Sequence, residues 1–323
     1  MTADPLKIAI IGLGNHARRN LAPAIEASPR FALTDCCTRD GQVGTEFAEE
    51  YGVNVYDDLG AMLANSDADC AVIATPTGVH FEQVQACLNA GKHCLVEKTA
   101  FASLEETRQV VELAQSRHLV VMEAFMFRFH AQFAALREYL ERLDPGSIRM
   151  IDCRFGFPHL GVDDIRYTAQ LAGGALNDCG AYTISSARAL LGEGAQIRHA
   201  QVASEVGYAV DTQGLAILKD DSGRIASCSW MFGASYQNAV SIWCADRIIE
   251  VERAYSKPPT LETKITVRAN GAVVETIAVP ACNHFVAMLD AFADAVAQGI
   301  ASGMHEEMLE QAKFLQLVRD SSC

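Results

Sequence analysis

The first part of the chain alternates short apolar runs with longer segments whose apolar residues recur at helical spacing. The runs predict strands at 7–11, 31–37, 53–55, 70–74, 93–97 and 119–122. The segments between them predict helices at 16–27, 43–51, 58–64, 79–90 and 104–116. Such alternation is typical of a doubly wound parallel sheet. Ligands bind beyond the carboxyl ends of its strands, so a site is expected after the first, second, fourth and fifth strands.

From residue 124 onward, long runs of alternating apolar and polar residues replace this pattern. They predict strands at 148–154, 197–206, 213–219, 225–232, 239–244, 247–251, 263–269 and 272–279. Helices are predicted at 130–142, 178–191, 284–297 and 304–319. Turn sequences such as Asp220-Asp221-Ser222-Gly223 and Asn270-Gly271 join several strands as hairpins. The pattern indicates an α+β domain with a large, mostly antiparallel open sheet and helices on one face.

The first predicted strand runs directly into Gly12-Leu13-Gly14-Asn15-His16-Ala17, which has the spacing Gly-x-Gly-x-x-Ala. In this strand-to-helix context Gly12 permits a tight turn and Gly14 lets the backbone approach a pyrophosphate, while Ala17 keeps the helix close to the strand. The helix N-terminus offers free N–H groups to the phosphates. We therefore predict an α/β protein in which residues 1–123 form a Rossmann domain that binds NAD(P). Residues 124–323 would form a domain for substrate binding and oligomerisation.

The loop after the second strand, around Thr38-Arg39-Asp40, is expected to meet the adenosine ribose. An acidic residue at the strand tip favours NAD, whereas a cation there accepts the 2′-phosphate of NADP. Asp35 lies inside the strand and Asp40 follows the arginine, so neither occupies the tip. We predict that Thr38 and Arg39 bind the 2′-phosphate and that NADP(H) is preferred, with NAD(H) possible. The alternative is that Arg39 is a solvated surface residue.

Composition narrows the class of protein further. Half of the 323 residues are hydrophobic, so sizeable cores can be buried. The formal net charge is −14, and because an acidic surface repels nucleic acid and anionic membranes, we expect neither as a partner. The eleven cysteines include no Cys-x-x-Cys pair, so no metal site is predicted. We interpret them as buried, reduced side chains of a cytoplasmic protein. Because the far face of an open sheet needs covering, a homodimer or homotetramer through the C-terminal sheet is expected.

Four further segments, with the glycine motif, resemble the glucose–fructose oxidoreductase/inositol dehydrogenase (Gfo/Idh/MocA) family in order and spacing along essentially the whole chain. They are Ala74–His80, Val96–Thr99, Met122–His130 and Gly173–Tyr182. Shorter segments look most like the sugar 3-ketoreductases of nucleotide-linked deoxysugar pathways. These are Asp164–Tyr167, 242–250, Ser256–Pro259 and His284-Phe285.

The resemblance implies that Lys98 and Tyr182 lie beside the nicotinamide. Hydride arriving at a ketone leaves an alkoxide that needs a proton, and a nearby ammonium lowers the pKa of a tyrosine that supplies it. Tyr182 is therefore the predicted general acid and Lys98 its electrostatic partner. Asp178, one helical turn before Tyr182, is expected to orient Lys98 or to bind a substrate hydroxyl, although it would also serve as a helix N-cap. Arg166 and His284 are predicted substrate contacts.

The predicted cofactor contacts come from the segments after the four strands named above. They are Gly12, Gly14, Asn15, His16, Ala17, Thr38, Arg39, Thr75, Pro76, His80, Glu97 and Lys98. One departure from the family concerns Thr99, because relatives usually have proline after the lysine, in a peptide bond that can be cis. A cis bond before a residue other than proline costs about 2.5–4 kcal/mol, so we expect Lys98 to be presented through a different local backbone.

These features predict an NADP-dependent oxidoreductase that transfers hydride between nicotinamide and a keto or hydroxyl group of a sugar. The substrate would be a carbohydrate or a nucleotide-sugar, and the predicted reaction is the reduction of its keto group. One alternative is an aldose 1-dehydrogenase or dihydrodiol dehydrogenase that uses the same residues. Another is an NADP-binding sensor without turnover, whose signature would be tight cofactor binding and no hydride transfer.

Overall fold

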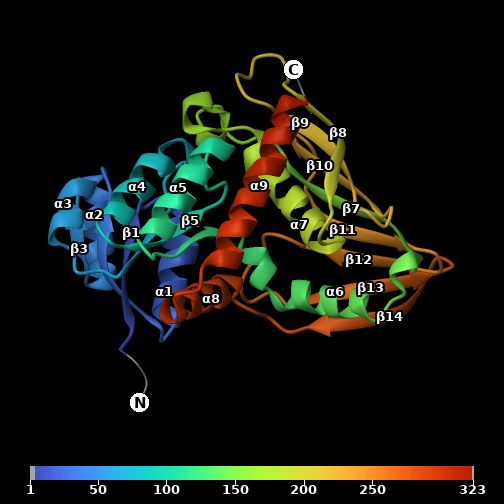
Figure 1. Cartoon of the computed structure of the whole chain (residues 1–323), viewed down its shortest axis with the longest axis horizontal. Helices are drawn as coiled ribbons and strands as arrows, with labels where there is room; N and C mark the ends of the chain where they lie inside the picture. Colours follow the sequence, from blue (N-terminus) through green and yellow to red (C-terminus); the bar gives the residue numbers. More distant parts are fainter. Residues whose placement is uncertain (1–3, 322–323) are drawn as a thin grey trace. The chain divides into compact units, whose positions relative to one another are not determined.

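The computed structural model describes residues 4–321, which divide into two compact units. The first unit comprises Met1–Ala124 and Phe285–Ala312, and the second comprises Phe125–His284 and Lys313–Cys323. Each unit is built on one sheet, as Figure 1 shows. No helix in residues 4–321 is long and apolar enough to cross a membrane.

The first unit contains a six-stranded sheet in the order β3-β2-β1-β4-β5-β6, and every pairing in it is parallel. The predicted doubly wound sheet is therefore confirmed. The strand order reverses at β1, so the carboxyl ends of β1 and β4 flank the crevice where such sheets bind ligands. The strands are β1 (Leu6–Ile11), β2 (Phe31–Cys37), β3 (Asn54–Tyr56), β4 (Cys70–Ile73), β5 (His93–Glu97) and β6 (Val121–Ala124).

Helices connect these strands close to the predicted positions. The predicted helix at 16–27 contains a π-helical turn, Ala17–Leu21, and continues as α1 (Ala22–Ala27). The others are α2 (Gly41–Tyr51), α3 (Leu59–Asn65), α4 (His80–Asn89) and α5 (Leu104–Ser116).

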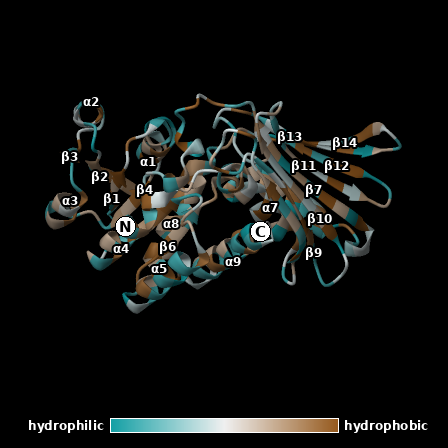
Figure 2. Ribbon diagram, turned by 90° about the horizontal axis from the view of Figure 1, so that it is seen from above, coloured by the Kyte–Doolittle hydropathy of each residue, from teal (hydrophilic) through white to brown (hydrophobic). Residues whose placement is uncertain are grey.

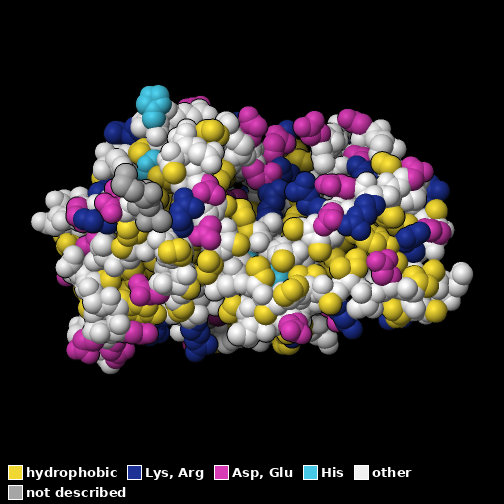
Figure 3. All heavy atoms as spheres, turned by 90° about the horizontal axis from the view of Figure 1, so that it is seen from below, with side chains coloured by type: hydrophobic (Ala, Val, Ile, Leu, Met, Phe, Trp, Pro, Cys, Tyr) yellow, Lys and Arg dark blue, Asp and Glu magenta, His cyan; other side chains and the backbone are white. Residues whose placement is uncertain are grey.

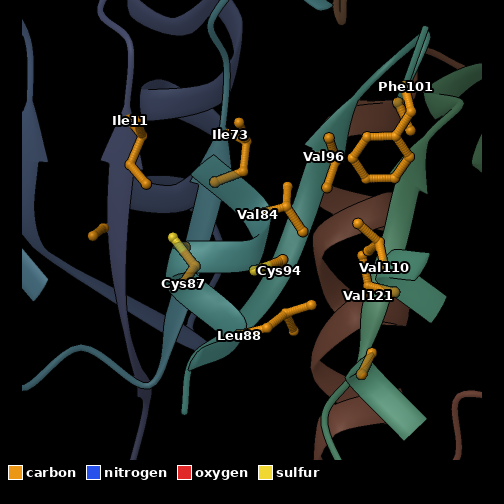
Figure 4. Close-up of a cluster of buried hydrophobic side chains, with 14 of the residues drawn as sticks. Ile11, Ile73, Val84, Cys87, Leu88, Cys94, Val96, Phe101, Val110 and Val121 are labelled. Carbon is orange, nitrogen blue, oxygen red and sulfur yellow. The ribbon is translucent and has the colours of Figure 1, made fainter. Parts of the chain in front are cut away.

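One hydrophobic core of the first unit lies between the sheet and helices α4 and α5 (Figure 4). Strand side chains such as Ile73 and Val96 meet Val84 and Leu88 of α4 and Val110 of α5, and all five are fully buried. Cysteines take part in this packing as small apolar side chains. All ten cysteines of the described residues are free thiols, and eight of them are buried.

The first unit also includes helix α8 (His284–Gln298), from Phe285 on, and the first part of α9 (Ser302–Asp320). Asp290 of α8 accepts a hydrogen bond from Ser28 at 2.8 Å, and Asp294 pairs with Arg30 at 2.8 Å. The rings of Phe31 and Phe292 stack with centroids 6.3 Å apart. Helix α8, far along the chain, therefore packs beside the start of β2.

The second unit contains an eight-stranded sheet in the order β14-β13-β12-β11-β7-β10-β9-β8. Only β7 and β10 pair in parallel among its strands, which confirms a mostly antiparallel sheet. Helix α7 lies on one face of this sheet (Figure 2). The strands are β7 (Ile148–Phe157), β8 (Gln196–Ala203), β9 (Gln213–Lys219), β10 (Ile225–Phe232), β11 (Gln237–Cys244), β12 (Ile248–Glu252), β13 (Thr263–Ala269) and β14 (Ala272–Val279). The helices are α6 (Ala131–Glu141) and α7 (Ala181–Leu191), the latter preceded by a π-helical turn, Leu176–Gly180.

The two faces of this sheet differ in burial. Along β10, Ala226, Cys228, Trp230 and Phe232 are buried, while the residues between them are at least partly exposed. Such alternation is expected of a sheet covered by helices on one face. On the molecular face in Figure 3, acidic side chains are spread among basic ones, in keeping with the net charge of −14.

A buried lysine fastens the start of α6 to the sheet. Lys257 is 5% exposed, and its Nζ donates to Oε1 of Gln132 at 2.9 Å and to the carbonyl of Ala254 at 3.1 Å. The Nε2 group of Gln132 donates in turn to the carbonyl oxygens of Glu252 and Lys264. Burial lowers the pKa of Lys257 from 10.5 to about 7.

This burial makes stability depend on pH. Between the folded-state pKa of about 7 and the unfolded value of 10.5, the unfolded chain binds more protons at Lys257, so stability rises with pH. We expect the free energy of unfolding to increase from pH 7 to pH 9 by up to about 1.4 kcal/mol per pH unit from this group. Urea titrations of the wild type and Lys257→Met should show the increase only where Lys257 is present. Lys264→Met, which removes an exposed lysine of β13, is the control, and an equal slope in all three proteins would contradict the prediction.

Candidate active site

The turn after β1 has the geometry that its glycines predict. Gly12 has φ = +91°, and its N–H donates to the carbonyl of Cys37 at 2.9 Å. A Cβ at Gly12 would lie 2.7 to 3.0 Å from atoms of Ala74 and Thr75, so only glycine fits there. At Gly14 an added Cβ would meet nothing within 4 Å, which leaves space beside its backbone. Ala17 is fully buried. This turn can therefore receive the pyrophosphate of a dinucleotide.

The helix that follows is joined to the carboxyl end of β5 by His16. Its Nε2 lies 2.9 Å from Oε1 of Glu97, and its Nδ1 lies 2.9 Å from the amide nitrogen of Asn20. Burial opposes ionisation of Glu97, but the charge and hydrogen bond of His16 outweigh this effect, so the pKa of Glu97 lies below its ordinary value. His16 and Glu97, both predicted cofactor contacts, are thus brought together. Asn15, also predicted, is exposed at the start of the helix.

At the end of β2 the acidic side chains are engaged within the protein. Asp35 is buried and accepts hydrogen bonds from Thr34, Asn54 and Ser66. Asp40 caps α2 by accepting from the N–H groups at positions 42 and 43.

The arginine between Thr38 and Asp40 differs from both aspartates. Arg39 is exposed at the carboxyl end of β2, beside the half-buried Thr38. An exposed guanidinium can accept a 2′-phosphate, whereas Asp35 is buried and Asp40 uses one carboxylate oxygen to cap α2.

The loop after β4 is held by His80, which is 1% exposed. Its Nε2 lies 2.7 Å from the carbonyl of Thr75, and its Nδ1 lies 2.9 Å from the carbonyl of Ala100. Burial lowers the pKa of His80, although its hydrogen bonds to these carbonyl oxygens act in the opposite direction. His80, a predicted cofactor contact, therefore links the backbones that follow β4 and β5. Pro76, next to Thr75, lies in extended backbone before the helical turn Thr77–Val79.

The peptide bond between Lys98 and Thr99 is cis. The expectation that threonine imposes a different backbone from the cis peptide of the family is therefore wrong. Thr99 is buried, and its carbonyl accepts a hydrogen bond from the hydroxyl of Thr77. Lys98 follows directly on β5, and its N–H donates to Oε2 of Glu97 at 3.2 Å.

In the second unit, Tyr182 lies in a cluster of aromatic rings on the first turn of α7. Its ring contacts those of Phe125, Phe155 and Tyr255 at centroid distances of 5.7, 5.4 and 5.6 Å. The side chain is buried, and its hydroxyl donates to Sδ of Met126 at 3.4 Å. A thioether is a weak acceptor, so this contact holds the phenolic proton loosely.

Arg166 and Asp178 form an ion pair one turn before Tyr182. The Arg166 Nε donates to Oδ2 of Asp178 at 2.8 Å, and its Nη1 donates to Asp164 at 3.1 Å. Burial disfavours the charged arginine, but the two carboxylates outweigh it and raise the pKa of Arg166. Two predicted substrate contacts are thus in direct contact. Asp178 does not act as the N-cap considered in the sequence analysis, because the helical turn already begins at Leu176.

His284, the remaining predicted substrate contact, lies in the interior. It is 1% exposed, and its ring packs edge-to-face against His130 with centroids 5.5 Å apart. No sequence motif points to another residue near this site, Asp211, whose carboxylate accepts the N–H of Leu176 at 2.6 Å. Among residues 4–321 no group of three or more His, Cys, Asp or Glu side chains could hold a metal ion.

Family models match both halves of the chain. Residues 6–125 match the model described as "Oxidoreductase family, NAD-binding Rossmann fold", and residues 133–250 match the Gfo/Idh/MocA C-terminal domain. The fold and the glycine turn thus define a nicotinamide-dependent oxidoreductase. The chain belongs to the Gfo/Idh/MocA oxidoreductase family.

Individual relatives match more than nine tenths of the chain. A dTDP-3,4-didehydro-2,6-dideoxy-alpha-D-glucose 3-reductase from Streptomyces violaceoruber is 30% identical, over 99% of this chain and 96% of the relative. D-xylose 1-dehydrogenase (NADP(+)) 2 from Haloferax volcanii is 30% identical, over 91% of this chain and 90% of the relative. The structure is also similar to a 3-ketoreductase from Actinomadura kijaniata in complex with NADP and TDP-benzene, with a TM-score of 0.94, 28% identity and 98% coverage of both chains.

The geometry around Arg39 leads to a test of cofactor choice. Arg39→Ala should weaken NADPH binding by about tenfold or more and leave NADH binding nearly unchanged, because only NADPH carries the 2′-phosphate. Fluorescence titration with both cofactors measures the effect. Arg108→Ala removes an exposed charge from α5 and serves as the control. Equal losses of affinity for the two cofactors would refute the role of Arg39.

Proposed function

We propose that this protein uses NADPH to reduce a keto group on a nucleotide-linked deoxyhexose. The observation that carries the proposal is the similarity, over 98% of both chains, to a 3-ketoreductase that was crystallised with NADP and TDP-benzene. Several 3-reductases of a dTDP-linked deoxysugar are also similar over nearly their whole length. Arg39 supports the choice of cofactor, since it can pair with the 2′-phosphate.

The cofactor would be held by the turn from Gly12 to Ala17, by Arg39 and Thr38, and by the loops after β4 and β5. Bound NADPH supplies the hydride. Gly14 leaves open space for a pyrophosphate, which the N–H groups at the start of the following helix would bind. The His80 bridge between the Thr75 and Ala100 carbonyls fixes the loops that carry Pro76 and Lys98.

Tyr182 would provide the proton. As hydride reaches the carbonyl carbon, the carbonyl oxygen takes the phenolic proton and becomes the product hydroxyl, and the phenolate recovers a proton from solvent. A tyrosine with a pKa of about 10 gives up its proton more readily when an ammonium stabilises the phenolate, which is the role we assign to Lys98. Structures of the A. kijaniata enzyme include a tyrosine-to-phenylalanine variant and two variants of a lysine, the same residue types as our proposed pair.

Arg166 and Asp178 would bind the sugar. Because each is already held by the other, the pair presents oriented donors and acceptors to substrate hydroxyls rather than an unpaired charge.

The outer face of the large sheet would bind a second copy of the chain. Trp243, Met231 and Ile248 expose 56%, 39% and 37% of their surface from strands β11, β10 and β12. The free thiols suit a reducing cytoplasm.

A second candidate is an aldose dehydrogenase that runs in the oxidative direction. The observation that favours it is the 30% identity to the xylose dehydrogenase over 91% of this chain. Assays with NADPH and dTDP-linked keto-sugars, and with NADP and free aldoses, distinguish the two. Tight NADPH binding without turnover in either assay would favour the sensor without catalysis.

The proposed acid is tested by Tyr182→Phe. The rate of hydride transfer should fall by about 100-fold or more, because no group then supplies the proton, while NADPH affinity stays within about twofold. Stopped-flow absorbance of NADPH in a single turnover measures the rate. The matched control is Tyr255→Phe, which removes a hydroxyl from a fully buried ring of the same aromatic cluster. An unchanged rate in Tyr182→Phe would remove Tyr182 from the mechanism.

A further inference from the structure

The helix that carries Asp178 and Tyr182 begins without a capping side chain of its own. Its first turn starts at Leu176, after Ala175, whose methyl group can accept no hydrogen bond. The N–H groups at a helix start need acceptors, which the preceding residue often supplies. Here Asp211, distant in sequence, supplies two. Its Oδ2 accepts the N–H of Leu176 at 2.6 Å, and its backbone carbonyl accepts the N–H of Ala175 at 2.9 Å.

The backbone at Gly174 leaves room for the carboxylate of Asp211. Gly174 has φ = +116°, and a Cβ there would lie 2.2 Å from Oδ1 of Asp211. Glycine at 174 is therefore needed both for the backbone angle and for the space that Asp211 occupies. A negative group at a helix N-terminus is also favoured by the helix dipole. Burial raises the pKa of Asp211, while the hydrogen bond from Leu176 and the charge of Arg319 oppose this shift.

The same contacts connect Asp211 to the loop that bears Arg166. The N–H of Gly174 donates to the carbonyl of Arg166 at 2.8 Å, so the residue that adjoins Asp211 also anchors this loop. In the segment before Asp211, Glu205 and Tyr208 contact His159 at 3.2 and 3.3 Å, near the beginning of that loop. A shift at Asp211 would therefore move the first helical turn and the Arg166 loop together.

We propose that Asp211 is a positioning residue that fixes the first turn of the helix, and through it the placement of Asp178 and Tyr182 for proton transfer. The proposal rests on the proposed function of this site. At the start of the helix Asp211 bonds the backbone N–H groups of Ala175 and Leu176, and its carboxylate also interacts with the side chain of Trp230, so it acts through the residues that follow. Misplacement of a catalytic group by about 1 Å can cost 100-fold in rate, so the loss of this anchor should slow the reaction.

A purely structural role would behave differently, and the chain offers a matched control. Asp211 lies two residues before β9, and Asp220 directly follows the same strand. Asp220 is 4% exposed and accepts the N–H of Arg224 at 2.8 Å. Its carboxylate also pairs with the Arg224 guanidinium. Asp220→Ala therefore removes a comparable carboxylate from the other end of the same strand, away from the helix start.

The experiment measures the rate of hydride transfer in a single turnover for three variants, Asp211→Ala, Asp211→Asn and Asp220→Ala. Each variant is made in the wild type and in Tyr182→Phe, and each is measured below its unfolding temperature. We expect Asp211→Ala to lower the rate about tenfold or more while NADPH affinity stays within about twofold. Asp211→Asn keeps an acceptor oxygen and should remain within about threefold of wild type. Since Asp211 acts through Tyr182, Asp211→Ala should change the rate less than about threefold once Tyr182 is phenylalanine.

Fully independent effects of the Asp211 and Tyr182 changes, or an equal slowing by Asp220→Ala, would overturn the proposal. If Asp211→Ala does not fold, Asp211→Glu replaces it. That variant keeps the charge but is longer by one methylene group, so a wild-type rate would count against positioning.

Amide hydrogen exchange separates this proposal from the proposed function, because it needs no turnover. The peptide covering 175–182 should exchange faster in Asp211→Ala than in Asp220→Ala, and equal exchange would overturn the anchoring role. If the wild type reduces no keto-sugar in the panel, the proposed function fails, while the exchange measurement still decides whether Asp211 holds the helix start.

Discussion

The placement of helix α7 depends on the contact between one indole ring and two glycines. Trp230, a fully buried residue of β10, lies against Gly180 at the helix start and Gly214 on β9. A Cβ at Gly180 would come within 2.9 Å of the ring, and one at Gly214 within 2.4 Å. The backbone at both glycines therefore lies directly against the indole ring, with no room for a side chain between them. This sets where the first helical turn lies, and hence where Asp178 and Tyr182 project.

A second use of close backbone contact appears at the end of β1. Gly12 packs against Ala74 and Thr75 so tightly that a side chain is excluded, while the space beside Gly14 remains open. The charged side chains at the end of the neighbouring strand β2 differ in what they contact. Asp35 and Asp40 accept hydrogen bonds from groups of the protein itself, while Arg39 between them is exposed. The two aspartates thus serve local folding, while the arginine between them projects its charge into solvent.

Much of this could be predicted from the sequence, because short-range patterns specify it. The glycine motif stands between a strand and a helix, and the alternation along residues 197–279 marks the strands of the large sheet. The parallel pairing of β7 with β10 has no local signal, since 67 residues separate Phe157 from Ile225 along the chain. The same holds for Asp211, whose partner Leu176 is 35 positions away. The backbone at Lys98 was predicted wrongly, because the prediction used only the intrinsic preference of a peptide bond before threonine. That preference contains no information about the tertiary contacts of the peptide.

The return of the chain to its starting unit has a consequence during synthesis. Ser28, Arg30 and Phe31 find their partners on α8, about 260 residues later. When residues 4–124 emerge from the ribosome, this side of the Rossmann unit therefore remains uncovered until α8 has also been made. A fragment that ends at Ala124 would expose Phe31 to water and leave Ser28 and Arg30 without these acidic partners. The unit that resembles an independent module in its sequence pattern is thus completed only by residues 285–312.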